Sequence, residues 1–269
     1  MKPLTVGNVV SAGLRIYRDR FFDYYKLAFF GYLWVLVPIY GWAKYSAMMG
    51  LISRLAFGEV TEKPEPIRDA QRFVKPRMWS FLGAGILVAL IFFAAMIVWG
   101  IIFGGAIAIL GATVGQNPNA ISIILGVLLF ITGLLFFLFA LTWLISRLLM
   151  VEVPLAIEEN VNATDAINRS WKLTKGSIFR LQLIILVGFL ISLPITIVIQ
   201  IASTLIQLVL GAILSSNPEL LSSLFLISTI VISIAGGALL IPFWQSIKAV
   251  IYYDLRVRRE GLGLNLEKN

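Results

Sequence analysis

The chain has 269 residues, of which 59% are apolar and 13% are charged, and its mean hydropathy is +0.92. Soluble proteins do not have this composition, so much of the chain is expected to lie in lipid. The chain contains no cysteine and no histidine, which excludes disulfides, thiolate or imidazole metal sites and Ser-His-Asp or cysteine catalysis. We therefore expect a protein that is not an enzyme and holds no metal or cofactor.

The first 26 residues predict an amphipathic helix that lies in the membrane interface. Apolar residues recur on one face at helical spacing, namely Val6, Val10, Gly13, Leu14, Tyr17, Phe21 and Tyr24. The basic residues of this segment lie elsewhere around the helix. Such a helix places its apolar face at the acyl boundary and its basic side chains among anionic headgroups.

Residues 27–56 form the next apolar segment, which is interrupted near its centre by Pro38 and Gly41. Proline followed by glycine suits a tight reversal between two helical arms. Each arm is short for a membrane crossing, which needs about 20 residues. We predict a short or re-entrant helical hairpin with its turn at Pro38. The alternative is one proline-kinked span that leaves the N-terminus outside.

Two longer helical hairpins are predicted over residues 79–146 and 181–247. Each contains two apolar stretches that exceed the length of a membrane span, separated by an Asn-Pro loop at 115–118 or 215–218. All lysines and arginines fall in four stretches, at 2–26, 44–77, 147–180 and 248–268, and neither loop has any. Basic residues stay on the cytoplasmic side, so both termini are predicted to be cytoplasmic and both loops to face outward.

Small residues recur within the first long hairpin. They occur every fourth position at Gly100, Gly104, Ala108 and Ala112, and every seventh at Gly126, Gly133 and Ala140. These spacings predict two seams of close helix packing.

The remaining segments are predicted to lie on the cytoplasmic surface. Residues 151–178 contain an amphipathic helix with Asn162 as its N-cap and Gly176 after its end. Residues 248–269 form a basic tail. The whole chain, 1–269, is thus predicted to be one all-α, polytopic transmembrane bundle of about six membrane helices, the first two short, with cytoplasmic-side amphipathic helices.

Three stretches carry a family resemblance. They are LTVG at 4–7 with its basic amphipathic helix, VPLAIE at 153–158 followed by AINRSWKLTKG at 166–176, and YYDLRVRREG at 252–261. Together they resemble the membrane domain attached to some bacterial glycerophosphoryl diester phosphodiesterases, which also occurs as a stand-alone membrane protein. The resemblance implies six membrane helices in a bacterial membrane, either the cell membrane or an internal one. The catalytic barrel of those enzymes is absent here, so the resemblance implies no catalytic residue.

A polar stripe marks the helix predicted over 181–214. Its members lie three or four residues apart and share one face: Gly188, Ser192, Thr196, Gln200, Ser203, Gln207 and Gly211. In lipid this face must meet protein or water, because an amide left unpaired there is costly. Hydrogen-bonded packing between helices is one interpretation. A polar passage for transport, or a slot for a ligand or lipid headgroup, is the other.

The cytoplasmic rim carries charged residues of both signs in two segments. A candidate docking or ion-pair surface comprises Glu158, Arg169, Trp171, Lys175, Asp254, Arg256, Arg258 and Arg259. Pairing of Glu158 or Asp254 with Arg169 would fix the Trp171 helix to the end of the last span. The alternative is a surface that binds anionic headgroups or a cytosolic partner through Arg256, Arg258 and Arg259.

These patterns predict a non-enzymatic scaffold, assembly factor or accessory subunit. The alternative is a small transporter or lipid-handling protein that uses the polar stripe. Expected partners are anionic membrane lipids and a membrane or cytosolic protein. Nucleic acid is excluded because the basic residues follow membrane sidedness and do not gather on one folded face.

Overall fold

The computed structural model describes residues 4–114 and 119–261, and all regular elements within these ranges are helical. In chain order they are α1 (Val6–Asp19), α2 (Phe21–Val35), α3 (Tyr40–Val60), α4 (Ile67–Val74), the short 3₁₀ helix η1 (Lys75–Arg77), α5 (Met78–Val114), α6 (Ala120–Leu148), α7 (Glu152–Ile157), α8 (Ala163–Thr174), α9 (Ile178–Ile213) and α10 (Pro218–Glu260). Four helical stretches are long and apolar enough to cross a membrane, at Ile67–Ala112, Ala120–Ile157, Ile178–Ile213 and Pro218–Glu260. The all-α class and the membrane character are therefore confirmed.

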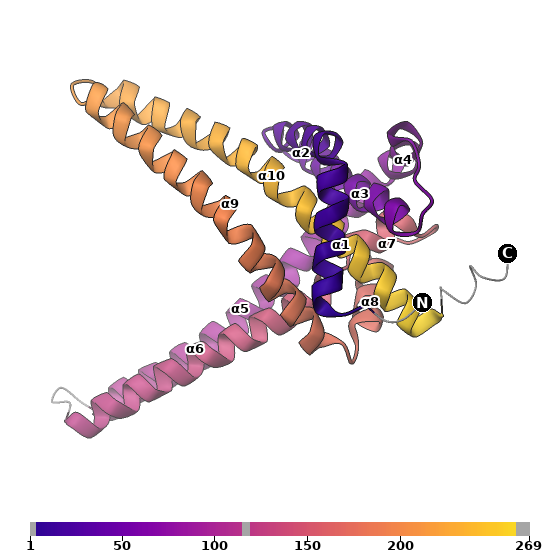
Figure 1. Ribbon diagram of the computed structural model, residues 1–269. Helices are drawn as coiled ribbons and strands as arrows, with labels where there is room; N and C mark the ends of the chain where they lie inside the picture. Colours follow the sequence, from indigo (N-terminus) through magenta and orange to yellow (C-terminus); the bar gives the residue numbers. More distant parts are fainter. Residues whose placement is uncertain (1–3, 115–118, 262–269) are drawn as a thin grey trace.

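Two long hairpins diverge from a common base (Figure 1). One consists of α5 and α6, the other of α9 and α10, and their outer ends lie far apart. We call the base the remaining helices together with the adjoining ends of these four. In the most apolar window of the α5 and α6 stretches no residue is buried within the chain, against 17% and 11% in those of α9 and α10. Such exposed apolar surface requires lipid around both hairpins.

The predicted N-terminal amphipathic helix is shorter than expected and is covered by protein. It ends at Asp19, and α2 begins at Phe21. Its buried residues include Val10, Gly13 and Tyr17. A Cβ on Gly13 would lie 2.8 Å from Cγ1 of Ile247 in α10, and the Tyr17 hydroxyl donates to the Leu239 carbonyl at 2.8 Å. The amphipathic pattern was read correctly, but its apolar face packs on α10, so the expectation that it faces the acyl boundary is wrong.

The segment around Pro38 is a reversal between two helices that pack on each other. α2 and α3 extend beyond the predicted 27–56, and the Tyr32 and Tyr45 rings meet with centroids 5.2 Å apart. Ile39 has φ 62° and ψ −72°, and the Tyr40 amide donates to the Pro38 carbonyl at 2.7 Å. This is a strained γ-turn. A Cβ on Gly41 would overlap the Trp34 carbonyl oxygen, so the close approach of the two arms requires glycine there.

The prediction for residues 151–178 agrees with the structure in its helix, whereas the prediction of a tail from residue 248 does not. Asn162 caps α8 in a capping box with Asp165, and Gly176 adopts φ 74°, as the sequence pattern indicated. Of the tail predicted over 248–269, the part up to residue 260 is not a separate element, and residues 262–269, like the predicted loop at 115–118, lie outside the described residues. α10 continues without a break to Glu260, and its residues from Ala249 to Leu255 are buried. The last apolar span and the charged segment that follows it are therefore one continuous helix.

Candidate functional site

A pocket of about 440 Å³ lies in the base where the two hairpins part. Its walls come from α3, from the inner end of α5, from the junction of α6 and α7, and from α10. The lining residues are Tyr45, Ser46, Met49, Phe81, Ala84, Gly85, Val88, Phe92, Ile145, Leu148, Leu149, Val151, Glu152, Ile241, Trp244, Gln245 and Lys248. The volume falls within the range of small-molecule sites.

The lining of the pocket changes from apolar to charged along its length, as the directions of the helices show. On α5 the lining runs outward from Phe81 to Phe92, and on α10 it runs inward from Ile241 to Lys248. On α6 and α7 it runs inward from Ile145 to Glu152. All three outer positions are apolar, and both charged residues stand at the inner end. The pocket is therefore amphipathic along the direction of the hairpins.

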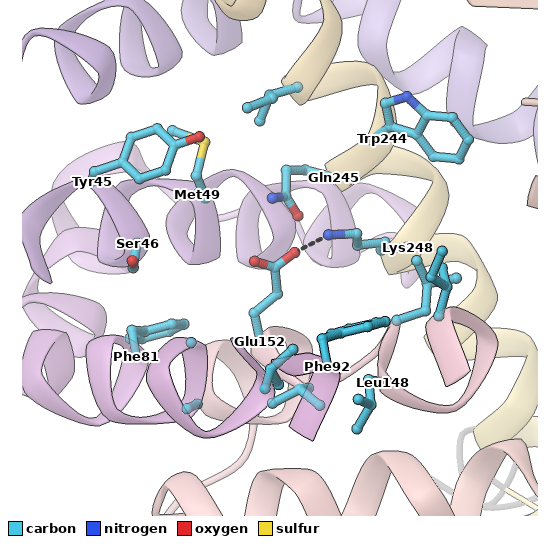
Figure 2. Close-up of a pocket in the computed structure, with 17 residues that line it drawn as sticks. Tyr45, Ser46, Met49, Phe81, Phe92, Leu148, Glu152, Trp244, Gln245 and Lys248 are labelled. Atoms are coloured by element: carbon cyan, nitrogen blue, oxygen red, sulfur yellow. Dashed lines mark hydrogen bonds and ion pairs between the residues drawn. The ribbon is translucent and has the colours of Figure 1, made fainter. Parts of the chain in front are cut away.

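The polar end of the pocket is an ion pair beside a buried amide. Figure 2 shows Glu152 and Lys248 pointing toward each other, and the Lys248 ammonium donates to Glu152 Oε1. Their side chains are only 27% and 19% exposed. The buried Ser53 hydroxyl donates to Gln245 Oε1 at 2.6 Å. The amide nitrogen of Gln245 makes no hydrogen bond with a described residue, so a donor is left at the polar end.

Part of the predicted cytoplasmic surface is a network of ion pairs that joins α8 to α10. Arg169 Nη2 donates to Glu158 Oε1 at 2.8 Å, and its Nη1 lies 2.5 Å from Glu260 Oε1. Arg256 Nε donates to Glu260 at 2.9 Å, and the Tyr252 hydroxyl donates to Glu158. Burial disfavours the charge on Arg169, but the hydrogen bonds to Glu158 and Glu260 outweigh it and raise the pKa of the guanidinium. Of the two carboxylates proposed to pair with Arg169, Glu158 does so.

The other carboxylate, Asp254, holds the N-terminal segment against α9 and α10. It is 2% exposed, and its Oδ2 accepts from Arg180 at 2.6 Å and from Arg258 at 2.8 Å. Its Oδ1 accepts from the Leu4 amide at 2.9 Å, and the Leu4 carbonyl accepts from both guanidinium groups. Two predicted surface residues, Asp254 and Arg258, are thus part of one structural cluster.

The remaining residues of the predicted docking surface are exposed. Lys175 and Arg259 form no ion pair with a described residue. Trp171 is 39% exposed, and its ring meets that of Trp143 at 5.5 Å. Arg147 lies over the Trp171 ring at 4.8 Å and donates to the Trp171 carbonyl. Of the eight predicted residues, Lys175, Arg259 and Trp171 are thus exposed without an ion pair to a described residue, whereas Arg258 is exposed but paired with Asp254.

The polar stripe on α9 divides into two parts. At its inner end Ser192 is buried, and a Cβ on Gly188 would lie 2.9 Å from Trp244 of α10. Ser203 and Gln207 are partly buried, whereas Thr196 and Gln200 are exposed. The Thr196 hydroxyl donates to the Ser192 carbonyl of its own helix. The side-chain amide of Gln200 makes no hydrogen bond with a described residue.

The sequence analysis did not predict the pocket that lies where the two hairpins part. Lys248 was predicted only as the start of the basic tail, and Ser53, Glu152 and Gln245 were not among the predicted site residues. One signal was available: polar Gln245 and Lys248 are three residues apart, so they share a face of α10 at the end of an apolar span. Arg180 was predicted only as the last residue of a basic stretch.

Comparisons with protein-family models, with curated proteins and with solved structures find no match for this chain. The resemblance to a phosphodiesterase membrane domain therefore stays a prediction.

Proposed function

We propose that this chain is a non-enzymatic membrane protein, a scaffold, assembly factor or accessory subunit, that binds a partner helix within the bilayer. The observation that carries the proposal is the exposed amide of Gln200. This residue lies about 20 Å from the outer end of α9, at 1.5 Å per residue, and so at hydrocarbon depth in a span. An unpaired amide in hydrocarbon costs several kcal/mol, about 4 or more. A partner helix with a polar side chain at the same depth removes that cost.

The neighbourhood of Gln200 suits close contact with such a helix. Thr196 is exposed one turn before it, and Thr204 donates its hydroxyl to the Gln200 carbonyl one turn after it. Because both threonine hydroxyls donate to backbone carbonyls of α9, they leave a weakly polar helix face on either side of Gln200. Glutamine both donates and accepts, so the partner can be a second copy or a different membrane protein.

The test is the replacement Gln200→Leu, with Ile197→Leu as the matched control on the same exposed helix. We expect wild type and Ile197→Leu to purify in mild detergent with a stoichiometric partner, and Gln200→Leu to lose it while its melting temperature is unchanged. Light scattering and mass spectrometry measure the mass and identify the partner. A monomeric wild-type protein, or a Gln200→Leu variant that keeps its partner, would contradict the proposal.

A second candidate function is lipid handling, which is favoured by the amphipathic pocket where the hairpins part. The transport alternative draws less support from the stripe, because Thr196 and Gln200 are exposed and no other described helix encloses them. The exposed Lys175, Arg259 and Trp171 suit contact with anionic headgroups at the cytoplasmic surface.

For the topology we propose six membrane helices, with α2 and α3 as a short hairpin and both termini cytoplasmic. Support comes from the turn between them, where Leu36, Ile39 and Trp42 are 60%, 62% and 47% exposed. Exposed apolar residues at a turn suit insertion into lipid. The chain lacks cysteine, so single cysteines at positions 8 and 117 can be labelled selectively. We expect an impermeant reagent outside the cell to label position 117 only. Labelling of both positions from outside excludes the α2–α3 membrane hairpin.

A further inference from the structure

The pocket at the fork combines an apolar outer part with two opposite charges at its inner end. Glu152 and Lys248 are the two charged residues among its lining, so its net charge is zero. A ligand of one charge would be attracted by one of these groups and repelled by the other. Glu152 and Lys248 pair with each other, and a ligand that carries both charges can insert into this pair and leave neither group without an opposite charge. Electrostatic complementarity of this kind selects partners.

We propose that this pocket binds the headgroup of a zwitterionic phospholipid with a primary ammonium, of the ethanolamine type. The phosphate accepts hydrogen bonds from the Lys248 ammonium, and the ligand ammonium donates to the Glu152 carboxylate. The unpaired amide nitrogen of Gln245 supplies a further donor to the phosphate. Val88, Phe92 and Ile241 contact the first part of the acyl chains, which leave toward the lipid between the two hairpins.

The lipid chemistry follows from hydrogen bonding as well as from charge. A primary ammonium has three donors for Glu152, whereas a trimethylated ammonium has none. A glycerol headgroup leaves the phosphate charge uncompensated, and that charge then lies beside Glu152. The aligned polarity of α6–α7 and α10 also fixes the orientation, with the headgroup toward the base and the tails toward the hairpins, while α5 supplies an apolar wall. The proposal is independent of the partner contact at Gln200.

The experiment measures binding of three short-chain phospholipids with the same tails and ethanolamine, choline or glycerol headgroups. The delipidated full chain is held in detergent, and the lipid-dependent rise in melting temperature gives the apparent affinity. We expect wild type to bind the ethanolamine lipid about tenfold more tightly than the other two, the effect of one well-placed hydrogen bond to a charged group.

The double variant Glu152→Gln/Lys248→Gln removes both charges and leaves neither partner alone. It should lose the headgroup preference, so that the three affinities become equal within about twofold. Glu59→Gln is the control, because Glu59 pairs with Arg20 at 2.8 Å outside this pocket. It should keep the wild-type preference. Equal binding of the three lipids by wild type, preference for the glycerol lipid, or a double variant that keeps the ethanolamine preference would each overturn the proposal.

Discussion

The two long hairpins differ in how they are held. The α9–α10 hairpin is built into the base: α10 packs on α1 at Gly13 and on α2 at Gly237, where a Cβ would overlap the Tyr32 ring, and it carries buried Asp254. The α5–α6 hairpin contacts the base only near its inner ends, for example where Phe81 lies against Gly50 of α3. The inner half of α10 therefore runs through the folded core, whereas α5 and α6 join the core through a few residues at their inner ends.

Composition follows the same division. The most apolar windows of the α5 and α6 stretches have a mean hydropathy of 2.9, against 2.6 and 2.5 for α9 and α10. Within α5–α6 the contact is aromatic, with Trp99 and Phe137 centroids 4.4 Å apart. In α10, Gln245 and Asp254 make buried side-chain hydrogen bonds to other elements. Both hairpins therefore need lipid, and the second is also held by tertiary contacts at its inner end.

The largest effect is expected from Asp254→Ala, which breaks the attachment of α10. It leaves Arg180 and Arg258 without their carboxylate and releases the Leu4 amide. Removing one partner of a buried charge cluster costs about 3 kcal/mol or more. We expect the free energy of unfolding in detergent to fall by that amount, measured from tryptophan fluorescence during chemical denaturation.

Asp69→Ala is the matched control for this loss. Asp69 pairs with Arg72 at 3.5 Å, and both side chains are more than half exposed. Exposed pairs of this kind contribute about 0 to 1 kcal/mol. If Asp254→Ala destabilises the protein no more than Asp69→Ala does, α10 is not held by its charge cluster, and the contrast between the hairpins is lost.

The sequence predicted the features that depend on local pattern. Hydropathy gave the four long helices, and Asn162 with Gly176 gave the bounds of α8 to within one or two residues. The amphipathic period also identified α1. These features depend on neighbours along the chain, so one sequence is enough to read them.

The sequence did not predict which helices pack against each other. The apolar face of α1 has the same pattern whether lipid or α10 covers it, and α10 covers it. The pairing of Asp254 with Arg180 joins residues 74 positions apart, and no spacing rule reaches that far. The charged run at the end of the chain was read as a tail because charge usually marks an exposed end, whereas here it continues a buried helix.

The two predicted seams of small residues differ in the structure, because one is exposed and the other packs against a helix. This difference leads to a prediction with a smaller expected effect on stability. Gly100, Gly104, Ala108 and Ala112 are all exposed, so this seam faces no described helix. Gly133 does face α5, where a Cβ would overlap the Phe103 ring. That ring is stacked on Trp99 at 4.8 Å, so it cannot move without disturbing a second aromatic contact. We expect Gly133→Ala to destabilise the α5–α6 hairpin by about 1 to 3 kcal/mol, as overpacking does.

Gly104→Ala gives the matched comparison, because a Cβ on Gly104 meets nothing within 4 Å. Alanine is the better helix former by about 1 kcal/mol, so this variant should be neutral or slightly more stable. Cysteines introduced on α5 and α6, in a chain that has none, allow spin-label distances to report the hairpin contact directly. The distance should broaden in Gly133→Ala and remain as in wild type in Gly104→Ala. Equal behaviour of the two variants would mean that lipid alone holds these helices together, and aromatic packing would then contribute nothing specific to the hairpin.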